Sequence, residues 1–335
     1  MRNLLMITSF LILIYACNQK TKSEYINFSG FTQGTTYNIT YESFDLINYQ
    51  ADIELILAEF DSSLSTYNSK SLISKINKNE SFETDDWFRY VYKKSEEVYY
   101  QSKGAFDITV APLVNAWGFG FKNKANVTNA VIDSILKFVG FQNVCLKDSL
   151  ILKKDPRVML DVNAIAQGYS VDIIAGFLEG KGIQNFLVEI GGEVKTKGVN
   201  KKGKPWKIGI DKPIDNNNIP GENLQSIIQL SNKALATSGN YRKFYERDGI
   251  KYSHTINPKT GYPVTHSLLS TTVIANDCII ADAYATAFMV MGLDKAYELA
   301  QKLPDIEAYF IYSDENGKYC VKATPAIQQW IEELN

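Results

Sequence analysis

The sequence predicts an α+β fold built as one large domain. Within its 335 residues, segments with helical spacing of apolar side chains and short alternating segments follow one another irregularly, and hairpin signals are frequent. A doubly wound parallel sheet would need a regular alternation of strand and helix, which is absent. We find no internal repeat and no long linker. A single domain over residues 25–335 is therefore expected.

Periodic apolar side chains, bounded by turn residues or capping residues, predict the helices. The expected ranges are 47–60, 71–76, 85–101, 129–139, 171–180, 277–291, 293–303 and 325–334. Asp85 is expected to cap the third of these helices, and Asn276 or Asp277 the sixth. Pro112 is expected to open a further short helix.

Alternating or wholly apolar runs predict the strands. They fall at 38–41, 144–153 (a hairpin), 158–162, 185–189, 195–198, 206–210, 227–230, 268–275, and 308–313 with 319–322. Residues 241–252 predict two more short strands around an Asp-Gly turn signal. The polar runs 237–240 and 257–261 predict tight turns on either side, with His254 between them. A ligand site and an ordinary surface hairpin are equally compatible with this stretch alone.

The N-terminus predicts a targeting segment. Met1-Arg2-Asn3 is basic, residues 4–15 are apolar, and Ala16-Cys17 precedes an abrupt polar turn. This pattern resembles a bacterial lipobox, which implies a signal peptide over residues 1–16, lipidation of Cys17 and a tether over residues 17–24. A plain signal peptide or a signal anchor is the alternative.

The composition excludes some classes of function. A net charge of −2 and 45% hydrophobic residues describe a soluble globular chain, and no basic stripe with interleaved aromatics predicts nucleic-acid binding. The lysines near residues 195–204 are expected to be solvated at a hairpin end. Cys145, Cys278 and Cys320 show neither metal-ligand spacing nor a disulfide framework, so we expect small buried hydrophobic side chains.

Asp282 and Thr286 form the clearest candidate for chemistry. They lie four residues apart on a predicted helix, so both oxygens face the same side, among alanines that leave room around them. Such a pair suits Mg²⁺ shared with substrate phosphates; a capped helix with a packed threonine is the alternative. Asp161, at the end of a predicted strand, precedes small residues at a helix start, which favours ligand contact or a simple cap.

Other nucleotide and hydrolase signatures are missing. The sequence contains no P-loop, and Gly191-Gly192 lacks the third glycine and the helix of a dinucleotide fingerprint. Neither histidine lies near a nucleophile-elbow sequence, so a Ser-His-Asp hydrolase is not supported.

Eight segments between Phe31 and Gly292 together resemble the ApbE-type FAD:protein FMN transferases, which are flavin-trafficking lipoproteins of bacteria. In order they are FTQGTTYNITY, SSLSTYN, GAFDITVAPLVNAWGFG, LDVNAIAQGYSVD, VEIGGEVKTKG, ATSGNYRKFY, HTINPKTGYPV and IADAYATAFMVMG. The chain departs from the family pattern at Gln33, where methionine is usual, and at Gln167, where lysine or glutamate is frequent. Neither departure removes an expected metal ligand.

The resemblance implies an ApbE-like (T-fold-like) α+β domain that transfers FMN from FAD to a threonine or serine hydroxyl of a partner protein, releasing AMP. It implies Mg²⁺ held by the side chains of Asp282 and Thr286 and the backbone carbonyl of Ala164. The implied flavin and nucleotide contacts are Gln33, Tyr67, Ala105, Phe106, Asp107, Asp161, Gln167, Thr237, Ser238, Gly239, Asn240, His254, Thr255 and Ile256. His254 is the candidate general base, with Asp161 as its rival.

The resemblance also implies a location and partners. We expect a lipid-anchored protein of the bacterial cell envelope, facing the periplasm from the inner membrane, whose acceptor is a membrane redox subunit. Two other functions remain possible on the same residues: a Mg²⁺-dependent FAD pyrophosphatase that gives FMN and AMP, and a non-catalytic, lipid-anchored flavin-binding protein.

Overall fold

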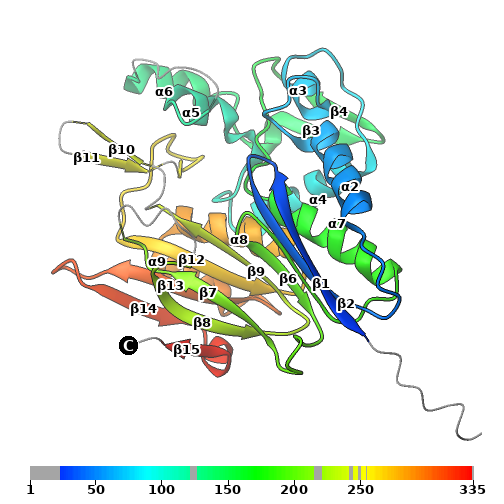
Figure 1. Cartoon of the computed structure of the whole chain (residues 1–335). Helices are drawn as coiled ribbons and strands as arrows, with labels where there is room; N and C mark the ends of the chain where they lie inside the picture. The colour runs from blue at the N-terminus through cyan, green and yellow to red at the C-terminus, as the bar shows by residue number, and fades with distance from the viewer. Residues whose placement is uncertain are drawn as a thin grey trace, which may run out of the picture.

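The fold is α+β, as predicted, with helices packed against mixed-size antiparallel sheets (Figure 1). The computed structural model describes residues 23–120, 127–214, 221–240, 244–247, 250–253 and 255–333. No helix within these ranges has both the length and the apolar character needed to cross a bilayer.

An eight-stranded antiparallel sheet forms the centre of the molecule, in the order β1-β2-β5-β6-β9-β12-β13-β14. Its strands are β1 (Glu24–Thr32), β2 (Thr35–Ser43), β5 (Phe186–Ile190), β6 (Glu193–Lys197), β9 (Ala234–Gly239), β12 (Leu268–Ala275), β13 (Glu307–Ser313) and β14 (Tyr319–Ala323). The β1–β2 hairpin turns at Gln33-Gly34, where both residues have positive φ, at 51° and 75°. Residues far apart in sequence therefore meet along one sheet.

Helices α7 (Ala166–Gly180) and α8 (Cys278–Met291) cover one face of this sheet. Strand β13 shows the alternation that results, because Ala308 and Phe310 join the core on the helix side. Tyr309 and Ile311, which alternate with these two residues along the strand, join a separate core on the other face. That second core is closed by a small sheet of β7 (Trp206–Asp211), β8 (Leu224–Leu230) and β15 (Ile331–Glu333).

The remaining elements surround α7 and α8 or lie at the edge of the molecule (Figure 1). They are α2 (Gln50–Leu64), α3 (Leu72–Asn77), α4 (Asp86–Gln101), η2 (Ile108–Val110), α5 (Ala111–Ala116), α6 (Asn129–Leu136), η3 (Phe141–Asn143), α9 (Leu293–Ala300) and η4 (Pro325–Gln329). Two hairpins complete the fold: β3 (Val144–Lys147) with β4 (Leu150–Lys153), and β10 (Phe244–Arg247) with β11 (Ile250–Ser253).

The close packing of α7 against α8 depends on Gly168. A Cβ atom placed there would lie 2.4 Å from the Cys278 carbonyl oxygen and 2.8 Å from the Asp282 Cβ atom. The Gly168 backbone N–H donates to Asp282 Oδ2 at 3.0 Å. Only glycine allows this approach, which brings the start of α7 against the middle of α8.

Several predicted elements are confirmed by their caps. Asp85 accepts a hydrogen bond from the Phe88 N–H at the start of α4, and Ser71 accepts one from the Ser74 N–H at the start of α3. Pro112 lies in the first turn of α5. The hairpin 144–153 and the two strands around the Asp-Gly signal also form as predicted.

Four predictions of secondary structure are wrong. Residues 158–162 are extended and buried but join no sheet, because the side chain of Asn77 bonds both the N–H and the carbonyl of Leu160. The predicted C-terminal helix is a short 3₁₀ turn followed by β15, which pairs with β8. Residues 237–239 end strand β9 and do not form a turn, since they pair with β12. Helix α2 continues to Leu64, beyond the expected stop.

The surface predictions also need correction. Lys195 is only 17% exposed in its side chain and forms ion pairs with Asp172 and Asp277, whereas a solvated lysine was expected. Of the cysteines, Cys278 is buried as predicted, but Cys145 is exposed and Cys320 is partly exposed. Asp277 precedes α8 without capping it through its side chain.

We predict that Gly168→Ala destabilises the fold by about 1–3 kcal/mol, because the added methyl group overlaps α8 despite the better helix propensity of alanine. Urea unfolding measures the change. Gly176→Ala on the exposed side of the same helix is the matched control, because its Cβ would meet nothing within 4 Å. The free energy of unfolding of that control is expected to rise by up to about 1 kcal/mol. Equal changes at the two positions would contradict this account of the packing.

Candidate active site

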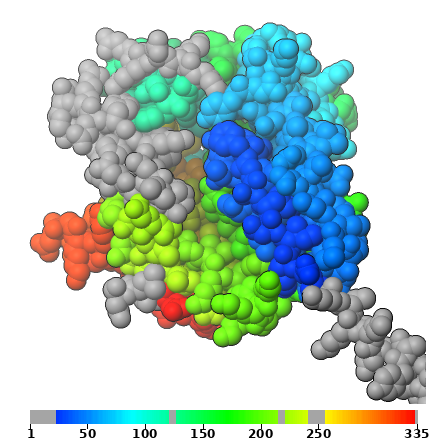
Figure 2. All heavy atoms as spheres, viewed as in Figure 1, coloured from blue at the N-terminus to red at the C-terminus, as the bar shows by residue number. Residues whose placement is uncertain are grey.

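A cavity of about 970 Å³ opens between the turn of the β1–β2 hairpin, the start of α7, the end of β9 and the middle of α8. Figure 2 shows the surface hollowed beside the blue β1–β2 hairpin. The volume lies at the upper end of the range for small-molecule sites and suits a ligand as large as a dinucleotide. All predicted site residues within the described ranges line this cavity except Asn240.

Asp282 is buried in the cavity wall, with 5% of its surface exposed. The Gly168 N–H donates to its Oδ2 atom, and in the described part of the chain no lysine or arginine pairs with it. Burial raises the pKa of the Asp282 carboxyl to about 7, although the Gly168 hydrogen bond opposes the shift. A buried carboxyl without a protein counter-charge is a natural place for a cation.

Thr286 lies one helical turn after Asp282 on α8 and also lines the cavity. Its Oγ1 atom lies 3.1 Å from Ser238 Oγ at the end of β9. At the preceding residue of β9, Thr237 Oγ1 lies 2.8 Å from Thr272 Oγ1 on β12. The β9 residues expected to form a polar turn thus supply hydroxyl groups from a strand, held by the sheet on one side and α8 on the other.

The segment before α7 supplies further oxygen atoms. Asp161 and Ala164 line the cavity, and Asp161 Oδ1 accepts a hydrogen bond from the Asn163 N–H at 2.9 Å. Asp161 is held in place because its own N–H donates to the Ile108 carbonyl at 2.7 Å. Burial raises the pKa of the Asp161 carboxyl. The expected ligands Ala164, Asp282 and Thr286 are thus brought to one cavity.

These residues fit a magnesium ion by their chemistry. A carboxylate, a hydroxyl and a backbone carbonyl are oxygen donors, which Mg²⁺ prefers. No group of three or more His, Cys, Asp or Glu side chains that could hold a metal occurs among the described residues. A single carboxylate with neutral donors suits an ion that shares substrate phosphates, and not one held by protein alone.

Two glutamines line the cavity at the β1–β2 turn and the start of α7. Gln167 Nε2 donates to the Ile190 carbonyl at 3.1 Å, and Ser170 Oγ donates to Gln33 Oε1 at 3.4 Å. The Gln33 Nε2 atom is buried and has no hydrogen-bond partner within the described residues. A buried donor without a partner, on a residue that lines a cavity, favours a ligand acceptor at this place.

Asp107 and its neighbours Ala105 and Phe106 form another wall of the cavity. Asp107 Oδ1 accepts hydrogen bonds from the N–H and the hydroxyl of Thr109, at 2.8 and 2.7 Å. Burial raises the pKa of the Asp107 carboxyl to about 6, against the effect of these bonds. Tyr67 lines the same region, and 70% of its surface is exposed.

The segment just before the second polar run lines the cavity through Thr255 and Ile256. Asn240 does not line it, but its Oδ1 atom accepts a hydrogen bond from Thr255 Oγ1 at 2.7 Å. This bond joins the chain before β10 to the chain after β11. His254 lies outside the described residues.

The residue that caps α8 has no local signature in the sequence. The Asp172 carboxylate on α7 accepts from the N–H groups of Cys278 and Ile279, both at 2.9 Å, and Lys195 Nζ donates to it at 3.0 Å. Asp172 thereby provides the N-terminal cap of α8 that was expected from Asn276 or Asp277. Glu189, Glu193 and Asp211 also line the cavity and were not predicted, since a carboxylate on a strand has no local signature.

Comparisons with known proteins agree with this geometry. The model of the ApbE family matches residues 33–310. An FAD:protein FMN transferase of Vibrio cholerae is 36% identical over 310 residues, covering 90% of this chain and 91% of that protein. The enzyme of the same name from Haemophilus influenzae is 36% identical over 333 residues, covering 95% and 94%.

Solved structures show the same fold. The flavin transferase ApbE from Vibrio cholerae superposes with a TM-score of 0.82 at 34% identity, covering 92% of this chain and all of that one. The apo flavinyl transferase ApbE of Pseudomonas stutzeri gives a TM-score of 0.82 at 33% identity, covering 92% and 97%. The chain therefore belongs to the ApbE family.

Proposed function

We propose that this chain transfers FMN from FAD to a hydroxyl group of a partner protein, with AMP as the second product. The observation that carries the proposal is the buried Asp282 carboxyl, which has no counter-charge among the described residues and lies with Thr286 in a cavity of about 970 Å³. FAD is a long, flexible dinucleotide with a charged pyrophosphate, and this cavity offers both the room and a place for a charge-neutralising cation.

Mg²⁺ is the cation we assign to this place, with Asp282, Thr286 and the Ala164 carbonyl as protein ligands. When bound, it would neutralise the charge that develops on the pyrophosphate during transfer. The protein residues do the positioning. The Gly168 N–H orients the Asp282 carboxylate, and the contact with Ser238 orients the Thr286 hydroxyl.

The transfer exchanges the phosphoanhydride bond of FAD for a phosphoester bond to the acceptor. The acceptor oxygen forms a bond to the FMN phosphorus, the bond from this phosphorus to the AMP oxygen breaks, and the hydroxyl proton passes to a base. His254 is the base we favour, because its neighbours Thr255 and Ile256 line the cavity. Asp161 is the rival, because its carboxyl lies in the cavity wall and burial raises its pKa.

We further propose that the chain is anchored by a lipid on Cys17 and faces the periplasm from the inner membrane. The support is the sequence before residue 24, with its apolar segment and the Ala16-Cys17 step. A membrane redox subunit with an accessible threonine or serine is the acceptor we expect at such a location.

One incubation separates the transferase from its alternatives. FAD, Mg²⁺ and an acceptor protein are combined, and intact masses and free nucleotides are measured. Transfer gives an acceptor heavier by one FMN residue and an equal amount of AMP. Free FMN with AMP and no adduct would identify a pyrophosphatase, and intact FAD would identify a binding protein.

Asp282→Asn is expected to lower FMN transfer roughly 100-fold or more at saturating Mg²⁺, because the amide brings no charge to the cation. It should also abolish the further rise in melting temperature that Mg²⁺ gives the wild type in the presence of FAD. Asp294→Asn on α9, where 91% of the carboxylate side chain is exposed, is the matched control and should leave both measurements unchanged. A Mg²⁺ response that survives in Asp282→Asn would contradict the assignment.

His254→Ala is expected to slow FMN transfer roughly 10²- to 10⁴-fold at saturating FAD while the affinity for Mg²⁺ is retained. Single-turnover rates with a fixed acceptor give the measurement, and Asp161→Asn is measured in parallel. An unchanged rate in His254→Ala together with a loss in Asp161→Asn would make Asp161 the base. Unchanged rates in both variants would leave neither residue with that role.

Asp107→Asn is expected to stabilise the protein above about pH 6, by about 1–3 kcal/mol, and to weaken FAD binding. In the folded chain the pKa of Asp107 is raised to about 6, so between pH 4 and 6 the folded state keeps a proton that the unfolded state has lost. The stability from this group is therefore complete at low pH and is lost as the pH rises through 6.

Urea unfolding from pH 4 to 8 measures this effect. The difference in free energy of unfolding between wild type and Asp107→Asn should grow between pH 4 and 6 and then stay constant. A difference that is the same at every pH would show that burial of the charge is not its cause.

A further inference from the structure

Three large apolar side chains are exposed side by side in the loop between β2 and α2. Phe44 is 61% exposed, Leu46 57% and Ile47 46%. Single exposed hydrophobic residues are ordinary, but a contiguous group within four residues marks a surface that meets something less polar than water.

The loop is held rigidly with these side chains outward. Asp45 Oδ1 accepts from the Ser43 hydroxyl at 2.7 Å and from the Ile47 N–H at 3.2 Å. The buried Tyr41 hydroxyl donates to the Ile47 carbonyl at 2.8 Å and accepts from the Tyr49 N–H at 2.9 Å. Four hydrogen bonds within residues 41–49 leave the loop little freedom to turn its apolar groups inward.

Leu46 adds an independent sign of function. Its φ is 59°, in the left-handed region that a leucine side chain adopts at a cost. Asparagine or glycine would relieve this strain, and neither would present an apolar group. Strain of this kind persists where the exposed side chain has a use.

Lysine side chains flank the loop on the same end of the molecule. Lys181 follows α7, with its Nζ atom 5.4 Å from the Tyr49 ring centroid and 5.1 Å from that of Phe177. The exposed turn between β6 and β7 carries lysines at 201, 202 and 204. The hydrogen bond from the Tyr25 hydroxyl to the Val199 carbonyl, 2.8 Å long, places that turn beside the start of β1.

The acidic groups nearby are engaged by the protein itself. Glu42 accepts hydrogen bonds from the Ser23 hydroxyl and from Asn185. Glu179 pairs with Lys197 at 3.1 Å, and Asp45 is bonded within the loop. Hydrogen bonds from neutral donors leave the charges of Glu42 and Asp45 in place. The lysines at 181, 201, 202 and 204 have no acidic partner among the described residues, so their four positive charges can meet an anionic surface.

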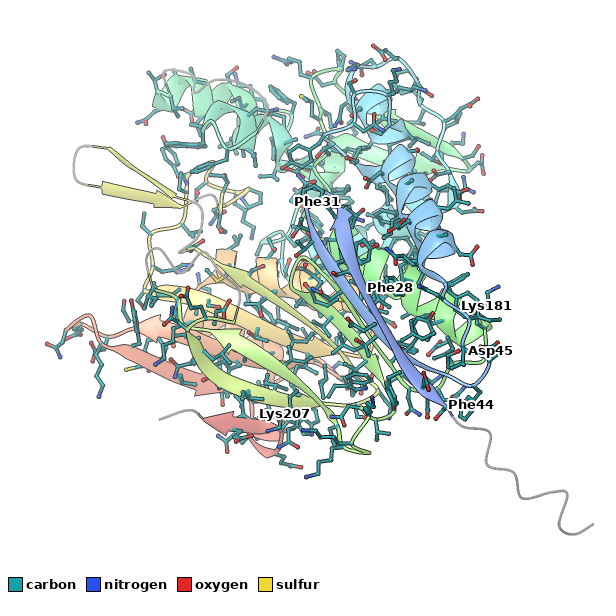
Figure 3. All side chains as sticks on the ribbon, viewed as in Figure 1. Phe28, Phe31, Phe44, Asp45, Lys181 and Lys207 are labelled. Atoms are coloured by element: carbon teal, nitrogen blue, oxygen red, sulfur yellow. The ribbon has the colours of Figure 1, made fainter. Side chains whose placement is uncertain are left out.

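The chain enters the fold at this same end. Glu24, the first residue of β1, pairs with Ser43, and Phe44 follows directly. In Figure 3, Phe44 and Asp45 lie where the chain enters β1, with Lys181 close by, whereas Phe31 lies at the opposite tip of the hairpin. Glu24 is seven positions after Cys17, a span of at most about 25 Å, so a lipid on Cys17 would hold this end near the bilayer.

We propose that the loop 44–47, Lys181 and the turn 201–204 form a membrane-contact face, in which the apolar side chains enter the interface of the bilayer and the lysines bind anionic lipid headgroups. The proposal agrees with the anchor proposed above but does not require it. The face combines the two signals that hold peripheral proteins at a membrane, buried apolar area and positive charge.

Vesicle flotation with the chain that begins at Ser23 tests the face without any anchor. This chain keeps all four hydrophobic clusters and every strand of the structure. We expect binding to vesicles of phosphatidylcholine and phosphatidylglycerol at 7:3, and binding at least about tenfold weaker to phosphatidylcholine alone.

Two sets of substitutions separate the contributions. Phe44→Ser, Leu46→Asn and Ile47→Ser together should weaken binding to the 7:3 vesicles about 10- to 100-fold without lowering the melting temperature, since asparagine tolerates the φ of Leu46. Lys201→Gln, Lys202→Gln and Lys204→Gln together should weaken it about tenfold or more and remove most of its salt dependence. FMN transfer to an acceptor in solution should be unchanged in both sets.

Leu150→Ser, Leu152→Ser and Val321→Ser form the matched control, since these side chains are 42%, 41% and 38% exposed elsewhere on the molecule. The control should bind vesicles like the wild type. The proposal is overturned if the wild type does not bind, if the control loses as much as the loop set, or if the loop set binds normally. Reduced FMN transfer with normal vesicle binding would instead identify a protein-docking face.

The intact mass of the full chain, with and without Cys17→Ser, reports lipidation separately. The absence of a lipid would therefore contradict the proposed anchor. The membrane-contact face would still be tested by vesicle flotation alone. Loss of transferase activity in all chains would likewise affect only the proposed reaction.

Discussion

The contact between α7 and α8 determines where the functional groups lie. Gly168 lets the two helices approach until its N–H bonds Asp282, a residue 114 positions later in the chain. One turn further along α7, Asp172 caps the first residues of α8 and is itself held by Lys195 from β6. Both helices and the central sheet are thus fixed to one another at a few points. Every oxygen donor assigned to the cation depends on that arrangement.

The burial of carboxyl groups in the cavity wall lowers the free energy of unfolding, and we attribute this cost to the function of the site. Burial raises the pKa values of Asp107, Asp161 and Asp282, so each charge is held in the fold against its preference for water. Burial also raises the pKa of the Asp172 carboxyl, but Lys195 and two backbone N–H groups oppose that shift. Asp172 therefore stabilises the fold, whereas Asp107, Asp161 and Asp282 line the cavity, where a ligand can contact them.

Much of the fold follows from local sequence. Caps such as Asp85 and the apolar periodicity of α4 act within a few residues, and the antiparallel hairpins are set by their turns. Residues 158–162 show where such reasoning fails, because an apolar run reveals burial but not its partner, which is the side chain of Asn77. The strand pairing of β15 and the cap by Asp172 are likewise made by residues distant in sequence.

The candidate site shows the same division. Asp282, Thr286, Gln33 and Asp161 could be named from the segments that resemble the family, and the cavity brings them together. Their spatial relation could not be derived, because it arises from Gly168 and from the register of β9 against β12. Strand carboxylates such as Glu189 had no pattern to reveal them.

The β1–β2 hairpin has one more consequence. Each of its strands has nine residues, and its turn at Gln33-Gly34 lines the cavity while its other end carries Phe44. At about 3.4 Å per residue, the hairpin spans roughly 27 Å. With the Phe44 end at a bilayer, it would work as a spacer of fixed length. Flavin would then be delivered at one height above the lipid, and an acceptor threonine or serine buried at the membrane surface would be out of reach.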